Sequence, residues 1–230
     1  MNPNRGNSHI TALIVTLATC WGTYAVAEDL SVTVTGENGA PLAYAVAYVR
    51  SPELASAAAD GSRPPATIDQ RDQQFLPHSK AIQRRTEVTF PNSDNVRHHV
   101  YSFSEPKRFE LPLYGDETPS PIAFDTAGAV ALGCNIHDHM LGYLFIVDTP
   151  VFGSADSSGH IRLEDVPVDD DDAELRIWHP GLGQDSNGEP VQWTAGDDVQ
   201  VTLPVVDEPP AEPEGLGGRR RNLDDRFGTD

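Results

Sequence analysis

Short runs of alternating apolar and polar residues, separated by turns, fill most of this chain. Such alternation predicts strands with one buried face, because successive side chains of a strand point to opposite sides. The predicted strands are Leu30–Thr35, Pro41–Val49, Glu87–Phe90, His98–Phe103, Arg108–Leu113, Pro121–Phe124, Ala129–Leu132, Leu141–Val147, Ala173–Trp178 and Val199–Val206, with a hairpin over Ala155–Leu163. Gly, Pro, Asn and Asp separate the runs, and almost nothing has a helical period. The pattern predicts an all-β protein, a sandwich or a barrel.

Two segments lack this alternation. Residues 51–71 are rich in Ala, Ser, Pro and charged side chains, and we expect a linker there. Residues 207–230 contain mainly Pro, Glu, Gly and Arg without apolar periodicity, which predicts a disordered, acidic and proline-rich tail. The predicted folded part therefore lies between the N-terminal region and residue 206.

The N-terminal 27 residues have the pattern of a secretory signal peptide. Arg5 supplies the positive charge, Ile10–Ala27 is apolar and almost uncharged, and Ala25-Val26-Ala27 forms an A-x-A cleavage site before Glu28. We expect export to a bacterial periplasm and no membrane insertion after cleavage. An apolar run of this length also leaves open an uncleaved anchor helix.

The charge balance is strongly acidic, with 16 Lys and Arg against 35 Asp and Glu and a formal net charge of −19. Nucleic acids and anionic membranes repel such a protein, so we expect neither as a partner. The acidic residues concentrate in 169–172, in 184–189 and in the tail. This distribution is more typical of a solvated surface than of a docking patch.

Beyond the predicted signal, the chain has a single cysteine and a single methionine, and they lie close together. Cys134, His137 and Met140 follow a C-x2-H-x2-M spacing. An exported protein with one cysteine forms no internal disulfide, so Cys134 is a free thiol, an intermolecular link or a metal ligand. A thiolate, an imidazole and a thioether suit copper, with the thioether as a weak axial ligand.

A second imidazole can come from the histidine pair upstream, and the residues alone leave His98 and His99 both open. Asparagines near the ligands could orient them or donate to the sulfur, with Asn135 the best placed of Asn92, Asn95 and Asn135. His139 is expected to face solvent at the metal end. With His98, Cys134 and His137, it could also imitate a structural zinc site.

The segment 72–148 resembles the cupredoxin family of type 1 blue copper proteins, in particular amicyanin and plastocyanin. The motifs that carry this resemblance are, in order, Phe75–His78, Val88–Asp94, His98–Val100 and Cys134–Met140. The spacing from Cys134 to Met140 is similar to that of amicyanin. His98-His99-Val100 resembles the His-Asn-Val of the group, which implies that His98 is the ligand and that His99 takes the Asn position.

Two further resemblances complete the expected organisation. Arg97–Phe103 with Gly133–Met140 resembles exported cupredoxin-domain proteins labelled methylamine utilization proteins. Val32–Val49 and Asp156–Trp178 resemble small Ig-like sandwiches of the carboxypeptidase-regulatory or transthyretin-like kind.

These resemblances imply a Greek-key cupredoxin β-sandwich over 72–148, inserted into a discontinuous Ig-like β-sandwich formed by 29–50 and 149–206. A single elongated sandwich is the alternative.

The expected function follows from the ligand set and the resemblance. We expect one type 1 copper held by His98, Cys134, His137 and Met140, and a protein that carries single electrons between periplasmic redox proteins. It needs no general acid or base, and we expect no enzymatic activity. Two alternatives remain open at this point: a copper-binding or delivery protein, and an accessory subunit of a periplasmic redox enzyme.

Overall fold

The computed structural model describes residues 27–60, 63–183, 186–194 and 196–206. The predicted signal peptide, apart from Ala27, and the predicted tail lie outside the described residues. Within the described ranges, no helix is long and apolar enough to cross a membrane. Strands dominate the part of the chain that the structure describes, with one α-helix, α1 (Pro52–Asp60), and one short 3₁₀ helix, η1 (Pro180–Leu182). The all-β class predicted from the sequence is confirmed.

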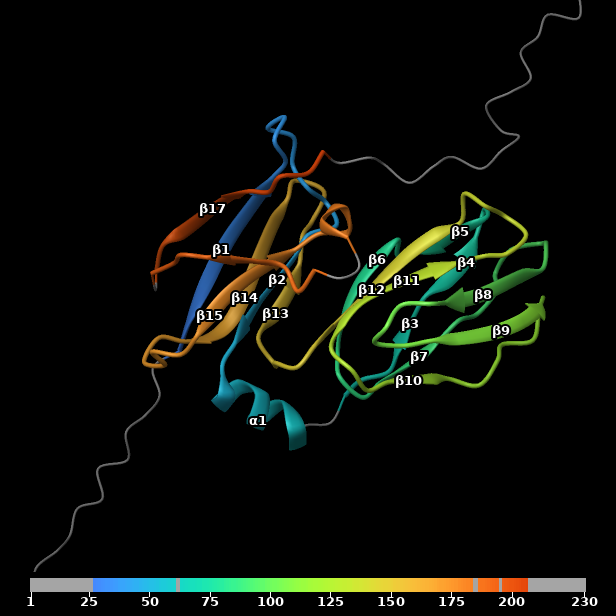
Figure 1. The fold of residues 1–230 in the computed structure, drawn as a ribbon, viewed down its shortest axis with the longest axis horizontal. Helices are drawn as coiled ribbons and strands as arrows, with labels where there is room; N and C mark the ends of the chain where they lie inside the picture. The colour runs from blue at the N-terminus through green and yellow to red at the C-terminus, as the bar shows by residue number, and fades with distance from the viewer. Residues whose placement is uncertain (1–26, 61–62, 184–185, 195, 207–230) are drawn as a thin grey trace, which may run out of the picture.

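The two ends of the described chain form one sandwich, called here the flanking sandwich (Figure 1). Its first sheet has the order β14-β1-β17 and its second the order β13-β2-β15-β16. The bounds are β1 (Ala27–Thr35), β2 (Val46–Arg50), β13 (Phe152–Ser154), β14 (His160–Pro167), β15 (Glu174–Trp178), β16 (Glu189–Val191) and β17 (Asp198–Thr202). β1 pairs with β14 antiparallel and with β17 in parallel.

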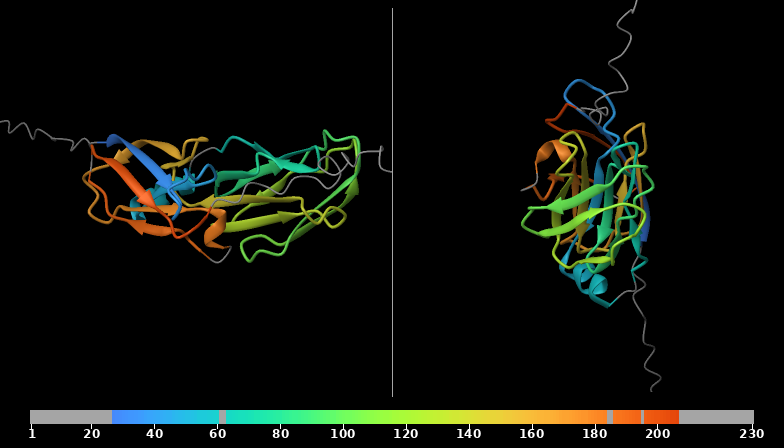
Figure 2. Two further views of the ribbon diagram at one scale, coloured as in Figure 1. Left: turned by 90° about the horizontal axis from the view of Figure 1, so that it is seen from above. Right: turned by 90° about the vertical axis from the view of Figure 1, so that its right-hand side faces the viewer.

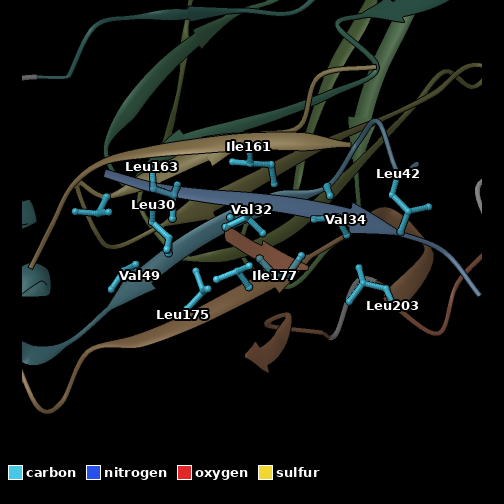
Figure 3. Packing of buried hydrophobic residues seen from close by; sticks show 14 of the residues in the cluster. Leu30, Val32, Val34, Leu42, Val49, Ile161, Leu163, Leu175, Ile177 and Leu203 are labelled. Atoms are coloured by element: carbon cyan, nitrogen blue, oxygen red, sulfur yellow. The ribbon is translucent and has the colours of Figure 1, made fainter. Parts of the chain in front are cut away.

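The alternation of β1 explains why this sandwich has an apolar interior. Leu30, Val32 and Val34 are buried between the sheets, in one core cluster with Ile161 of the paired strand β14 and Ile177 of β15 in the opposite sheet (Figure 3). Polar side chains occupy the intervening positions of β1 and remain partly exposed. Burial of the apolar face is the main favourable contribution to the fold of this part.

The middle of the chain forms the central sandwich. One sheet has the order β6-β12-β11-β8-β9, and opposite it lie β10-β7-β3 and the hairpin β4-β5. The bounds are β3 (Ala66–Thr67), β4 (Asp69–Arg71), β5 (Gln74–Leu76), β6 (Ser79–Gln83), β7 (Thr86–Thr89), β8 (His98–Ser102), β9 (Phe109–Tyr114), β10 (Ile122–Phe124), β11 (Gly128–Gly133) and β12 (Leu141–Val147). A second core of buried apolar residues fills the space between these sheets and includes Cys134 and Met140 at one end.

The chain leaves the flanking sandwich after β2 and returns to it at β13 (Figure 1). β2 pairs with β13 and β15, so residues 46–50 pair with 152–154 and 174–178 rather than with the central sheets. This pairing is what an inserted central sandwich requires. That the central sandwich is an independently folding domain with the predicted bounds stays a prediction.

The two sandwiches lie end to end and share an apolar contact (Figure 2). Phe145 from β12 stacks on Trp178 from β15, with ring centroids 4.5 Å apart and an interplanar angle of 15°. Tyr48 from β2 packs against Phe145, with ring centroids 5.5 Å apart. Because Trp178 and Phe145 are both buried, this contact couples the position of β12 to the flanking sandwich.

The segment 51–71 is not the linker expected from its composition. Ser51 caps the start of α1: its Oγ accepts a hydrogen bond from the Leu54 N–H at 3.2 Å, and Pro52 occupies the first helical position, where its missing N–H costs nothing. Alanines then continue the helix. Farther on, β3 pairs in parallel with β7, and Ile68 and Gln70 are fully buried. Alternation over only a few residues concealed these strands in the sequence.

Candidate metal centre

Three neighbouring strands bring the candidate ligands to one end of the central sandwich. His98 is the first residue of β8, Cys134 follows β11 and Met140 precedes β12. β11 and β12 pair antiparallel as far as Gly133 opposite Leu141, so the loop between them is tightly closed. Gly133 also pairs with Tyr101 of β8. The sheet register therefore places His98 beside the loop that carries Cys134 and His137.

The ligand atoms of His98, Cys134 and His137 converge. The Nδ1 atoms of His98 and His137 are 3.1 Å apart. The Cys134 Sγ lies 3.9 Å from the His98 Nδ1 and 3.6 Å from the His137 Nδ1. These three atoms all lie within 4.8 Å of one another, as a set that could hold a metal ion. Within the described part of the chain, this is the one cluster of at least three such residues.

Burial divides the four candidate ligands into an inner and an outer group. His98, Cys134 and Met140 have relative exposures of 0%, 3% and 2%. His137 is half-buried, between the exposed residues Ile136 and Asp138. The Met140 N–H donates to the His137 carbonyl at 2.9 Å, which fixes the end of the loop, and the Met140 side chain packs in the same core cluster as Cys134.

The structure separates the two neighbouring histidines. Adjacent residues of β8 point to opposite faces, and His98 faces the core. His99 lies on the opposite face of β8 with its side chain 13% exposed, and its Nε2 lies 2.9 Å from the Glu110 Oε1. The structure thus brings His98 to Cys134 and His137 and leaves His99 outside the cluster. That His98 rather than His99 binds the metal remains a prediction.

The electrostatics of the cluster favour a thiolate. Burial by itself raises the pKa of the Cys134 thiol, but hydrogen bonds from His98, from the backbone N–H groups of His99 and Ile136, and from His137 lower it to about 6. For His98, burial lowers the pKa, while hydrogen bonds to Cys134 and Asp94 outweigh it and raise the pKa above its ordinary value. A thiolate is the form of cysteine that binds metals.

Sequence reasoning missed Asp94, which contacts His98 directly. The Asp94 Oδ2 lies 2.9 Å from the His98 Nε2 and also accepts a hydrogen bond from the Gln73 N–H at 2.9 Å. The Asp94 Oδ1 accepts from the Asn95 N–H at 2.9 Å. The run Pro91-Asn92-Ser93-Asp94 indicates only a turn. The signal that could have found Asp94 is the general pairing of metal-binding histidines with a carboxylate.

The other predicted neighbours lie around the centre in different ways. Asn92 organises the Asp94 loop: its Nδ2 donates to the Val96 and Tyr114 carbonyls at 2.9 and 3.2 Å, and its Oδ1 accepts from the Asp94 N–H at 2.9 Å. Asn95 and Asn135 are exposed.

His139 does not fit the solvent-facing position expected for it. The residue is half-buried, and its Nε2 is covered without a hydrogen-bond partner. Its ring centroid lies 6.1 Å from that of His137. It is not part of the three-residue cluster, so the four-ligand zinc alternative is not assembled.

The residues present fit a copper ion. Two imidazole nitrogens and a sulfur with a lowered pKa converge on one point, and a buried thioether lies in the adjoining core. Soft sulfur ligands combined with imidazoles select copper over hard cations such as Mg²⁺ or Ca²⁺.

Comparison with known proteins gives limited likeness. No protein-family model and no curated protein sequence matches the chain. Among solved structures, it is similar to a Cu-containing nitrite reductase from Thermus scotoductus, with 25% identity and a TM-score of 0.35 over 38% of this chain and 23% of that one. It is also similar to amicyanin from Paracoccus versutus, with 19% identity and a TM-score of 0.34 over 39% of this chain and 88% of that one. A third similar structure is a purple cupredoxin from Nitrosopumilus maritimus, with 20% identity and a TM-score of 0.32 over 36% of this chain and 100% of that one.

The chain therefore spans less than a quarter of the nitrite reductase. The candidate metal centre rests on its own contacts.

Proposed function

We propose that this protein is a type 1 copper protein of the cupredoxin kind, which carries single electrons in the periplasm. The observation that carries the proposal is the convergence of the His98 Nδ1, the His137 Nδ1 and the Cys134 Sγ within 4.8 Å. These three residues would hold the ion, and Met140 would be a weak axial ligand. The signal-like N-terminus supports the periplasmic location.

Bound copper would supply a couple between Cu(I) and Cu(II). The chain contributes a rigid frame for both states, because the ligands come from or adjoin β8, β11 and β12 of a single sheet. The core packed around Cys134 and Met140 restricts their movement and excludes water from the sulfur atoms. Such a frame keeps the ligands in one arrangement when the charge of the ion changes.

Burial favours electron transfer over the alternative of copper delivery. A delivery protein passes its metal to the ligands of another protein, so its own ligands must be accessible. Here His98, Cys134 and Met140 are almost fully buried, and His137 alone is partly exposed. An electron can pass through one exposed imidazole edge, whereas an ion held by three buried side chains cannot leave without opening of the loop. The partners that we propose are other periplasmic redox proteins.

Repeated redox cycling of the copper-loaded protein distinguishes the two roles. We expect reversible one-electron reduction and oxidation with the copper retained in the presence of a competing Cu(I) chelator. Cys134→Ser should abolish the centre, because a hydroxyl does not replace a thiolate, and His99→Ala should preserve it. Transfer of copper to the chelator at each reduction would instead support delivery.

A further inference from the structure

Hydrogen bonds hold both the side chain and the backbone of Asp94 in place. Its carboxylate contacts the His98 Nε2 at 2.9 Å and is anchored by the N–H groups of Gln73 and Asn95. Its own N–H donates to the Asn92 Oδ1. The Asp94 side chain is only 10% exposed. A carboxylate with this many fixed donors has little freedom to turn away from the imidazole.

We propose that Asp94 is the positioning residue of the metal centre. Its carboxylate accepts the Nε2–H of His98 and so leaves the Nδ1 lone pair directed at Cys134 and His137. This inference rests on the proposed function, since it assigns Asp94 to the same copper ion. It adds a residue that touches none of the other candidate ligands and acts through His98.

Three physical effects follow from the His98–Asp94 pair. The Asp94 carboxylate at 2.9 Å from the His98 Nε2 can only accept a hydrogen bond, whereas the His98 Nδ1 faces the His137 Nδ1 at 3.1 Å and the Cys134 Sγ at 3.9 Å, so the neutral ring carries its proton on Nε2. Only the doubly protonated ring also donates from Nδ1 to the Cys134 sulfur. A carboxylate on the far nitrogen also makes the imidazole a stronger donor to a metal. Its negative charge stabilises Cu(II) more than Cu(I), because the oxidised ion carries the larger positive charge.

The neighbouring residue of β8 provides a matched control. The His99 Nε2 lies 2.9 Å from the Glu110 carboxylate, the same distance as in the His98–Asp94 pair. The Glu110 side chain is 70% exposed, and His99 points away from the cluster. Each pair joins a histidine of β8 to a carboxylate, and the pairs differ in the exposure of the carboxylate and in whether the imidazole faces the candidate ligands.

The charge of Asp94 is tested with Asp94→Asn and Glu110→Gln in copper-loaded protein. We expect Asp94→Asn to weaken Cu(II) binding by roughly 10- to 100-fold and Cu(I) binding by less. A tenfold difference between the two oxidation states raises the reduction potential by about 59 mV. Glu110→Gln should leave the affinities and the potential unchanged. Equal effects of the two variants, or an unchanged potential in Asp94→Asn, would overturn the proposal.

The orientation of His98 is tested without metal. In the copper-free protein at alkaline pH, nitrogen NMR should find the proton of neutral His98 on Nε2, and Asp94→Ala should give a mixture of the two tautomers. A wild-type ring with its proton on Nδ1 would contradict the positioning role. This NMR measurement tests the orientation of His98 even if the wild-type protein binds no copper. Absence of copper binding would refute the proposed function but not the role of Asp94 in orienting His98.

Discussion

The hydrogen bonds around Cys134 predict a thiolate in the metal-free protein. Burial opposes the thiolate, yet hydrogen bonds from His98, from two backbone N–H groups and from His137 lower the pKa from 9.0 to about 6. At neutral pH, about one molecule in ten would then keep the thiol proton, against about 99 in 100 for an unperturbed cysteine. We expect the copper-free protein to show the ultraviolet absorbance of a thiolate with a midpoint near pH 6.

His98→Ala should move this midpoint upward, because it removes the hydrogen bond that lowers the pKa most. The lowered pKa of Cys134 also makes the free energy of unfolding depend on pH. The unfolded chain binds its thiol proton more tightly, so this contribution to stability is fully present above pH 9.0 and is lost as the pH falls through about 6. The pH dependence of the difference in unfolding free energy between the wild type and Cys134→Ser measures this contribution. A thiolate midpoint near 9.0 would refute the hydrogen bonds that the structure places on the Cys134 sulfur.

Three further predictions concern the axial ligand, the contact between the sandwiches and the central fragment. Met140→Leu should retain copper and raise the reduction potential in voltammetry, because loss of a weak axial donor destabilises Cu(II) more than Cu(I); a lowered potential would count against the axial role. Trp178→Ala should cost roughly 3–5 kcal/mol in chemical denaturation, because it removes a fully buried ring stacked on Phe145. A fragment of residues 63–150 should fold and bind copper, whereas residues 72–148 should fold less stably without β3 and β4; equal stability by circular dichroism would contradict this.

Much of the fold was readable from local pattern. Leu30, Val32 and Val34 alternate with polar residues, and this period is enough to place β1 with one buried face. The long apolar run Leu141–Val147 has the bounds of β12 as predicted. The segment 51–71 was not readable, because its strands are two and three residues long and their pairing partners lie distant in sequence.

The candidate site was readable as a set of residue types but not as an arrangement. The spacing of Cys134, His137 and Met140 places three soft or imidazole ligands on one loop, and only chemistry is needed to see that they suit copper. Which histidine of the upstream pair faces the loop depends on the register of β8, which the structure supplies. Asp94 was missed because its contact with His98 depends on how the preceding turn folds back toward Gln73.

The absorption spectrum of the oxidised, copper-loaded protein tests the central claim most directly. A Cys134 thiolate bound to Cu(II) with two imidazoles gives an intense charge-transfer band in the visible range, and we expect this band in the wild type and in His99→Ala. It should be absent from Cys134→Ser and from His98→Ala. A protein that binds stoichiometric zinc and stays colourless with Cu(II) would contradict the assignment of His98, Cys134 and His137 as a type 1 copper centre.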